Sequence, residues 1–94
     1  MLRFRREFVR DLRVARDWYE LQRPGLGAEF LLAVQRLLDR IDAVPRQFSR
    51  IDPDVHRALL GRFPYAIFFL IDGEARVVLG LIHQAASPSR WPSP

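Results

Sequence analysis

The sequence predicts an α+β fold in which two helices pack against a small antiparallel β-sheet, in the order β-α-α-β-β-β. Residues 7–21 and 30–44 each repeat apolar side chains every three or four positions, as one face of a helix does. Residues 56–83 hold three runs rich in β-branched and aromatic side chains, which suit pleated strands. Residues 24–27, Pro-Gly-Leu-Gly, break the helical pattern, so the two helices should form an antiparallel hairpin.

The chain opens with a short expected strand. Leu2, Arg3 and Phe4 alternate apolar and charged side chains, which is the period of a half-buried strand. The first helix then presents an apolar stripe that we expect to face the sheet. Its members are Phe8, Leu12, Ala15 and Tyr19, widened by Val14, Trp18 and Leu21.

The second helix has a similar stripe and a clear end. The stripe consists of Phe30, Leu31, Val34, Leu37, Leu38, Ile41 and Val44. Pro45 and the polar stretch up to Pro53 end the helix. The hairpin therefore has an apolar face that can cover one side of a sheet.

Three strands form the expected antiparallel meander. They are His56–Phe63, Tyr65–Ile71 and Arg76–His83. Pro64 separates the first two strands, and Asp72-Gly73-Glu74 joins the last two with a glycine that supplies the positive φ of a tight hairpin. The middle strand is almost continuously apolar from Ala66 to Ile71, which predicts that both of its faces are covered.

Length and composition point to one domain over residues 1–94, with an irregular tail at residues 84–94. No apolar run approaches the roughly 20 residues of a membrane span, and no apolar segment follows the charged N-terminus. We therefore expect a cytoplasmic protein without membrane contact. The absence of cysteine excludes disulfides and thiolate metal sites, and no cofactor or metal motif is present.

The charge of the chain is carried in an unusual way. The formal net charge is +4, and arginine supplies all fifteen basic side chains. Because the planar guanidinium suits carboxylates and phosphates, an acidic protein or a nucleic acid is a natural partner. A genome that favours arginine codons explains the same composition, so the charge alone does not decide the function.

Candidate chemistry centres on two histidines, at the start of the first predicted meander strand and the end of the last. His56 and His83 fit structural side chains that hydrogen-bond to the backbone; the alternative is proton transfer near neutral pH. Arg57, Arg62 and Arg90 could line a concave surface beside His83, which is a partial set for metal-free RNA cleavage. No carboxylate pairs with His83 as the acid. The carboxylates of this half lie in loops and turns: Asp52, Asp54, Asp72 and Glu74.

Trp91 is a large apolar side chain in a polar tail. It either folds back to plug the end of the core or anchors a partner, as large aromatic side chains often do. Trp18 and Tyr19 present the same choice on the first helix.

The order of the elements and several short motifs, taken together, resemble the ParE/RelE superfamily of bacterial toxin–antitoxin modules, and the ParE branch in particular. The motifs are Asp11-Leu12, Trp18-Tyr19-Glu20, Pro45, His56–Leu60, Arg62–Tyr65, Val77–Leu79, His83 and Pro88–Trp91. The resemblance implies a cytoplasmic toxin held inactive by a cognate antitoxin whose acidic C-terminal segment is flexible.

The resemblance also separates two modes of action. RelE-like members cleave messenger RNA on the ribosome with basic residues on the sheet, but this chain has Ala66 and Leu59 at two such positions. Ala85 and Ala86 replace a further basic pair in the run from His83 to Pro88. Fewer cations leave less stabilisation for a phosphate transition state, so a ribonuclease is disfavoured.

ParE-like members bind and inhibit DNA gyrase without covalent chemistry of their own, and this is the function that the resemblance implies. The side chains expected to bind the target are Arg57, Arg62, His83, Arg90 and Trp91. One alternative is a ribosome-dependent endoribonuclease that uses the first four of these as catalytic residues. Another is a degenerate, non-toxic homologue, because Ala85, Ala86 and Ser87 depart from the ParE pattern as well.

Overall fold

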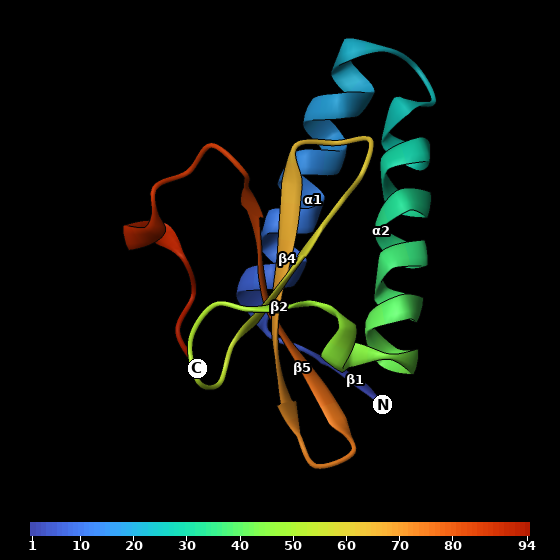
Figure 1. Ribbon diagram of the computed structural model, residues 1–94. Helices are drawn as coiled ribbons and strands as arrows, with labels where there is room; N and C mark the ends of the chain where they lie inside the picture. The colour runs from blue at the N-terminus through green and yellow to red at the C-terminus, as the bar shows by residue number, and fades with distance from the viewer.

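The computed structural model describes residues 1–94 and confirms the predicted α+β fold (Figure 1). Two long helices lie on one side of a five-stranded sheet. The elements are β1 (Leu2–Phe4), α1 (Arg6–Gln22), α2 (Leu26–Ala43), the 3-10 turn η1 (Pro45–Gln47), β2 (Ser49–Arg50), β3 (His56–Leu59), β4 (Tyr65–Asp72), β5 (Ala75–His83) and the 3-10 turn η2 (Pro88–Arg90).

The helical hairpin turns more tightly than the sequence suggests. The second helix starts at Leu26, four residues before the expected Phe30. The Glu20 carboxylate accepts hydrogen bonds from the backbone N–H groups of Gly25 and Gly27 at 3.0 Å, which satisfies donors that the first turn of α2 leaves free. Gly27, in the first turn of α2, lies very close to α1: a Cβ there would come within 3.0 Å of the Arg16 carbonyl oxygen. It permits close packing of the two helices.

The buried face of α1 is narrower than predicted. Phe8, Ala15 and Tyr19 are buried, but Val14, Trp18 and Leu21 are 65%, 55% and 84% exposed. The expectation that Val14 and Leu21 widen the core face was therefore wrong, and Trp18, which the sequence left open between the core and a partner contact, is more than half exposed. They lie roughly 100° around the helix from the buried stripe, on a side that neither α2 nor the sheet covers.

The sheet contains the predicted meander and two further strands. Its order is β1-β5-β4-β3-β2, with β1 parallel to β5 and every other pair antiparallel. The β4–β5 hairpin turns at Gly73 with φ +59°, as its glycine predicts. β1 adds a parallel pair at one edge of the sheet, beside β5, and the two-residue β2 extends the opposite edge, beside β3.

The first meander strand is shorter than predicted and ends at Leu59 instead of Phe63. Leu60 and Phe63 leave the sheet and turn into the core, where they are 4% and 5% exposed. The loop is closed by hydrogen bonds from the Leu60 N–H to the Tyr65 carbonyl at 2.9 Å and from the Tyr65 N–H to the Phe63 carbonyl at 2.8 Å.

Both faces of β4 are covered, as its apolar run predicts. Ile67 and Phe69 belong to the main core beneath the helices, and Ala66 and Phe68 belong to a smaller cluster on the other face. Figure 1 shows the C-terminal tail crossing the side of the sheet opposite α2. The tail is irregular apart from the single turn η2. We call the face under the tail the open face, since no helix packs on it.

Candidate functional site

The five side chains expected to bind a target do not gather in one pocket. Arg57 and Trp91 meet on the open face. Arg62 lines a groove beside α2, and His83 lines a pocket beside α1. Arg90 is exposed in η2 and forms no ion pair or side-chain hydrogen bond. The expected concave surface that holds three arginines beside His83 is therefore not formed.

The C-terminal tail packs on the open face, where no helix lies. The Trp91 ring lies 5.4 Å from the Phe68 ring, and the Arg57 guanidinium carbon lies 5.2 Å from the centre of the Trp91 ring. Arg57 stands directly opposite Phe68 in the β3–β4 register, and its Nε is buried without a hydrogen-bond partner. Arg5 Nη1 donates to the Ser93 carbonyl at 2.9 Å, which ties the end of the tail to the chain before α1. Trp91 thus folds back onto the sheet, which is the first of the two alternatives that the sequence left open.

Arg62 holds the β3–β4 loop against the start of α2. Its Nη1 lies 2.7 Å from the Glu29 carboxylate, and Arg23 Nη2 contacts the same carboxylate at 3.0 Å. Hydrogen bonds from Arg62 and then Arg23 hold the pKa of Glu29 below its ordinary value. Arg62 also lies over the Phe63 ring, with its guanidinium carbon 5.1 Å from the ring centre. These contacts give Arg62 a structural role.

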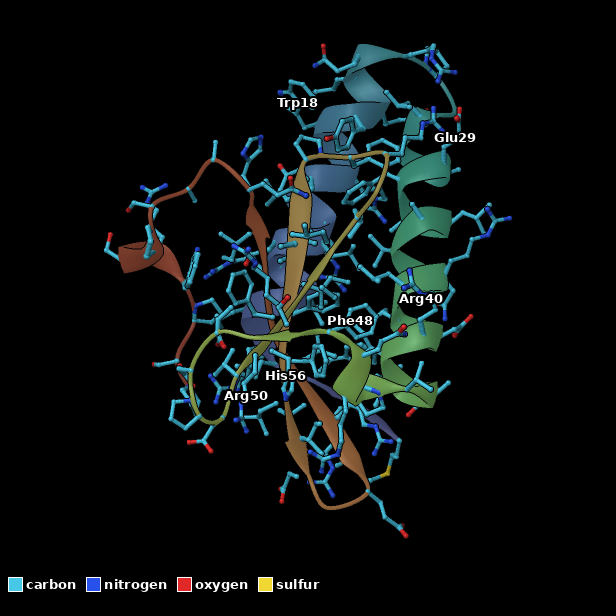
Figure 2. The ribbon with its side chains drawn as sticks, viewed as in Figure 1. Trp18, Glu29, Arg40, Phe48, Arg50 and His56 are labelled. Carbon is cyan, nitrogen blue, oxygen red and sulfur yellow. The ribbon has the colours of Figure 1, made fainter.

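Both histidines make the backbone contacts that a structural role predicts. His56 is 8% exposed, hydrogen-bonds the Phe48 carbonyl through Nδ1 at 3.1 Å, and stacks on Phe69 at 5.2 Å. Figure 2 shows the His56 and Phe48 side chains close together. His83 is exposed, and its Nδ1 accepts the Ala85 N–H at 3.0 Å. That bond assigns Nδ1 as an acceptor, which leaves Nε2 as the protonated nitrogen of the neutral ring.

An exposed apolar ridge on α1 is one surface that the sequence misplaced in the core. Val14, Trp18 and Leu21 form it, and Figure 2 shows Trp18 on the side of α1 away from α2. A pocket of about 330 Å³ beside it is lined by Trp18 together with Tyr65 and His83. The signal available in the sequence was the stripe itself, which is wider than one face of a two-layer fold can bury.

A second surface, which no sequence motif indicated, lies between α2 and β3. We call it the α2–β3 groove; its volume is about 460 Å³. Leu32 of α2 and Leu59 of β3 line it and are each 51% exposed. Arg36 and Arg40 line it from α2, and Arg62 lines it from the loop after β3. The groove joins apolar surface to a basic rim, a combination suited to a macromolecular partner.

The surfaces of the chain carry charge and apolar area but no cluster of metal ligands. No group of three histidine, aspartate or glutamate side chains is placed to hold an ion. Neither α1 nor α2 is long and apolar enough to span a bilayer.

Comparison with known proteins assigns the family. The family model of the ParE toxin of the type II toxin–antitoxin system, parDE, matches residues 2–88. No curated protein sequence matches the chain significantly. Among solved structures, the chromosomal ParDE toxin–antitoxin system of P. aeruginosa is similar in fold, with a TM-score of 0.76 and 20% identity over 87% of this chain and 92% of that one. Because the family model covers nearly the whole chain, from β1 to the start of η2, this protein belongs to the ParE family of type II toxin–antitoxin toxins.

Proposed function

We propose that this ParE-family toxin acts in the cytoplasm by binding and inhibiting DNA gyrase, and that a cognate antitoxin with an acidic, flexible C-terminal segment neutralises it. The family membership supports a toxin with an antitoxin partner. The remaining question is whether the toxin binds its target or cleaves it, and the geometry of the open face favours binding.

The observation that carries the proposal is the state of Arg57. Under the alternative of an mRNA endoribonuclease, Arg57 is the catalytic arginine that lies on the open face. Its guanidinium lies over the Trp91 ring. The positions around it are apolar: Ala66, Phe68 and Leu79 are buried in the cluster on that face. Cleavage of a phosphodiester requires several cations around one phosphate, together with an acid and a base. A single arginine covered by an aromatic ring does not supply that arrangement.

The replaced family positions support the same conclusion. Ala66 is 2% exposed, so no side chain there reaches solvent. Ala85 is exposed and Ala86 half-buried in the turn after β5, so neither of these two positions supplies a cation at the end of that strand. Removal of one preorganised charge contact lowers a rate by roughly 10²–10³-fold, so the loss of several disfavours a ribonuclease.

Arg90 is the target-binding candidate that can be tested most directly. Of the five proposed side chains, Arg57 and Trp91 contact each other and Arg62 pairs with Glu29. Arg90 is exposed in η2 without such a contact, so its replacement leaves the fold unchanged.

The experiment compares Arg90→Glu with Arg46→Glu. Arg46 is a matched control, because it is also an exposed arginine in a 3-10 turn and forms no ion pair. Purified protein is added to a gyrase supercoiling assay, and induced cells are scored for an SOS reporter and for ribosome-dependent mRNA cleavage. We expect wild type and Arg46→Glu to inhibit gyrase and induce SOS, and Arg90→Glu to do so at least ~10-fold more weakly.

Two outcomes would reject the proposal. Transcript cleavage on ribosomes without DNA damage would establish the ribonuclease alternative. Unaffected growth and uninhibited gyrase would identify a non-toxic homologue, the consequence expected if Ala85, Ala86 and Ser87 have removed the toxic surface.

A further inference from the structure

A hollow of about 540 Å³ lies where β1 passes into α1, at the blue start of the chain in Figure 1. Three arginines and three apolar side chains line this hollow: Arg6, Arg10, Arg13, Phe4, Val9 and Val14. We call it the β1–α1 hollow. None of the five side chains proposed to bind the target lines it, so the function proposed above makes no use of this surface.

The three arginines form one row along α1. They are four and three positions apart, so they share a face of the helix, and at 1.5 Å of rise per residue the row spans roughly 10 Å. All three residues are exposed. Arg6 and Arg13 form no ion pair, and Arg10 makes only a 3.4 Å contact with the neighbouring Asp11. The charges of the row are therefore free to bind a ligand.

No acidic side chain lines the β1–α1 hollow. The α2–β3 groove also has three arginines, but Glu29 lies among them and pairs with Arg62. No other hollow of the surface combines three arginines with the absence of a carboxylate. A concave surface lined by one sign of charge concentrates the opposite charge. The occupant therefore carries several negative charges, and guanidinium groups suit phosphates and carboxylates alike.

Phe4 favours one of these two chemistries. Its ring is 48% exposed and lines the hollow, and it stacks on the buried Phe8 ring with the ring centres 5.5 Å apart and 20° between the planes. Its backbone is held by the pairing with Val78 of β5. An aromatic ring that is fixed in place among arginines is a stacking platform for a nucleobase. Carboxylates alone would leave this ring uncovered.

We propose that the β1–α1 hollow binds a short stretch of single-stranded nucleic acid. One base stacks on Phe4, and successive phosphates lie along Arg6, Arg10 and Arg13. Phosphates recur about every 3.4 Å of rise along each strand of a duplex, so roughly 10 Å of strand supplies up to three of them. Paired bases are stacked inside a duplex, so contact with Phe4 requires an unpaired base. This binding goes beyond the proposed inhibition of gyrase and does not depend on it.

The test titrates fluorescein-labelled thymidine and uridine 12-mers with the full-length toxin and follows fluorescence anisotropy. Arg6→Gln with Arg10→Gln removes two charges of the row. Arg36→Gln with Arg40→Gln is the matched control, because it removes two exposed arginines at the same spacing of four residues, but on α2. Far-UV circular dichroism checks that each variant is folded, as expected for the replacement of exposed arginines.

The salt dependence counts the phosphate contacts. Each contact on a single strand contributes about −0.7 to the slope of log K against log salt concentration, so three contacts predict a slope of about −2. The affinity of the wild type should then fall roughly 20-fold between about 50 and 200 mM NaCl. We expect Arg6→Gln with Arg10→Gln to reduce the slope to about −0.7, and Arg36→Gln with Arg40→Gln to keep the slope of the wild type.

A second pair of variants tests the stacking. Phe4→Leu removes the flat ring but keeps an apolar contact with Phe8, and it should weaken binding about 10-fold without a change in the salt slope. Trp18→Leu is its control, since Trp18 is an exposed aromatic residue of α1 outside the hollow, and it should change the affinity less than about 2-fold. An abasic 12-mer should bind the wild type about 10-fold more weakly than the thymidine 12-mer, and should bind Phe4→Leu equally.

Several results would overturn the proposal. Equal weakening by the α1 and α2 arginine variants would show that the 12-mers respond only to net charge. Equal binding of the abasic and thymidine 12-mers by the wild type, or no binding of any 12-mer, would exclude the stacked base. If a peptide of twelve glutamates or vesicles of phosphatidylglycerol displaced the thymidine 12-mer at equal charge concentration, the hollow would be a site for acidic proteins or membranes. The tighter of the thymidine and uridine 12-mers, with the expected variant effects, would support the proposal and identify DNA or RNA as the occupant.

Discussion

Replacement of Trp91 by alanine tests how firmly the tail closes the open face. The ring packs on Phe68 and beneath the Arg57 guanidinium, and the side chain is half-buried. A fully covered aromatic side chain buries 150–250 Å², so this one covers roughly 100 Å², which is about 2.5 kcal/mol of transfer free energy. The aromatic contact with Phe68 and the cation–π contact with Arg57 add about 1 kcal/mol. The conformational entropy that a released tail regains offsets about 1 kcal/mol.

We therefore expect Trp91→Ala to lower the free energy of unfolding by about 2.5 kcal/mol, a large part of the total for a domain of this size. The melting temperature should fall by roughly 10 °C. Thermal unfolding followed by far-UV circular dichroism measures the change. Arg90→Ala is the control, since its exposed side chain forms no ion pair or hydrogen bond and its loss should alter stability by less than about 0.5 kcal/mol.

Fluorescence supplies an independent readout of the same docking. The chain has two tryptophans, and Trp18 is 55% exposed on α1. In a Trp18→Phe background the emission reports Trp91 alone and should shift to the red when the tail detaches. A Trp91→Ala protein that melts at the temperature of Arg90→Ala would show that the tail is not docked, and the argument about the covered Arg57 would fail with it.

Three further predictions follow from individual contacts. Phe69→Ala removes a fully buried ring and should cost about 3–5 kcal/mol in urea unfolding; a loss under 1 kcal/mol would contradict its core position. Gly73→Ala places a Cβ at φ +59° and should lower stability by about 1 kcal/mol, whereas Gly73→Asn should melt closer to wild type; equal melting of both with wild type would argue against the turn. The lowered pKa of Glu29 contributes stability that is present above the ordinary carboxyl value of 4.5 and is lost as pH falls below it through the folded-state value. The stability difference between wild type and Glu29→Gln should therefore shrink over that acid range in pH-dependent melting, and a difference independent of pH would refute the pairing with Arg62 and Arg23.

The elements that the sequence predicts well are those built from local interactions. Apolar spacing of three and four residues locates both helices, because residues so spaced share a helix face whatever surrounds it. The Gly73 turn is likewise local, since a positive φ is a property of one residue. The strand ends were less predictable: Leu60 and Phe63 have strand-forming chemistry, yet the core beneath the helices takes them out of the sheet.

In the candidate site, too, local features were predictable from the sequence and contacts between distant segments were not. The sequence identified His56 and His83 as strand-end residues and their backbone hydrogen bonds as the expected role, and both are present. It could not show that Arg57 lies against Trp91 or that Arg62 pairs with Glu29, because each pair joins segments more than 30 residues apart. It also left open whether Trp18, at the margin of the apolar stripe, is buried or exposed, because periodicity gives the face of a helix but not how much of that face a neighbour covers.

By itself, the sequence determined the kind of molecule: two amphipathic helices, a β-rich second half, an excess of arginine, and motifs similar to those of ParE toxins. Only the tertiary structure decided where those properties act. It placed β1 beside β5, laid the tail over the open face, and left the α2–β3 groove lined by leucines and arginines. The reason is physical: local spacing selects secondary structure, whereas exposure and charge pairing depend on which distant segments come to share a surface.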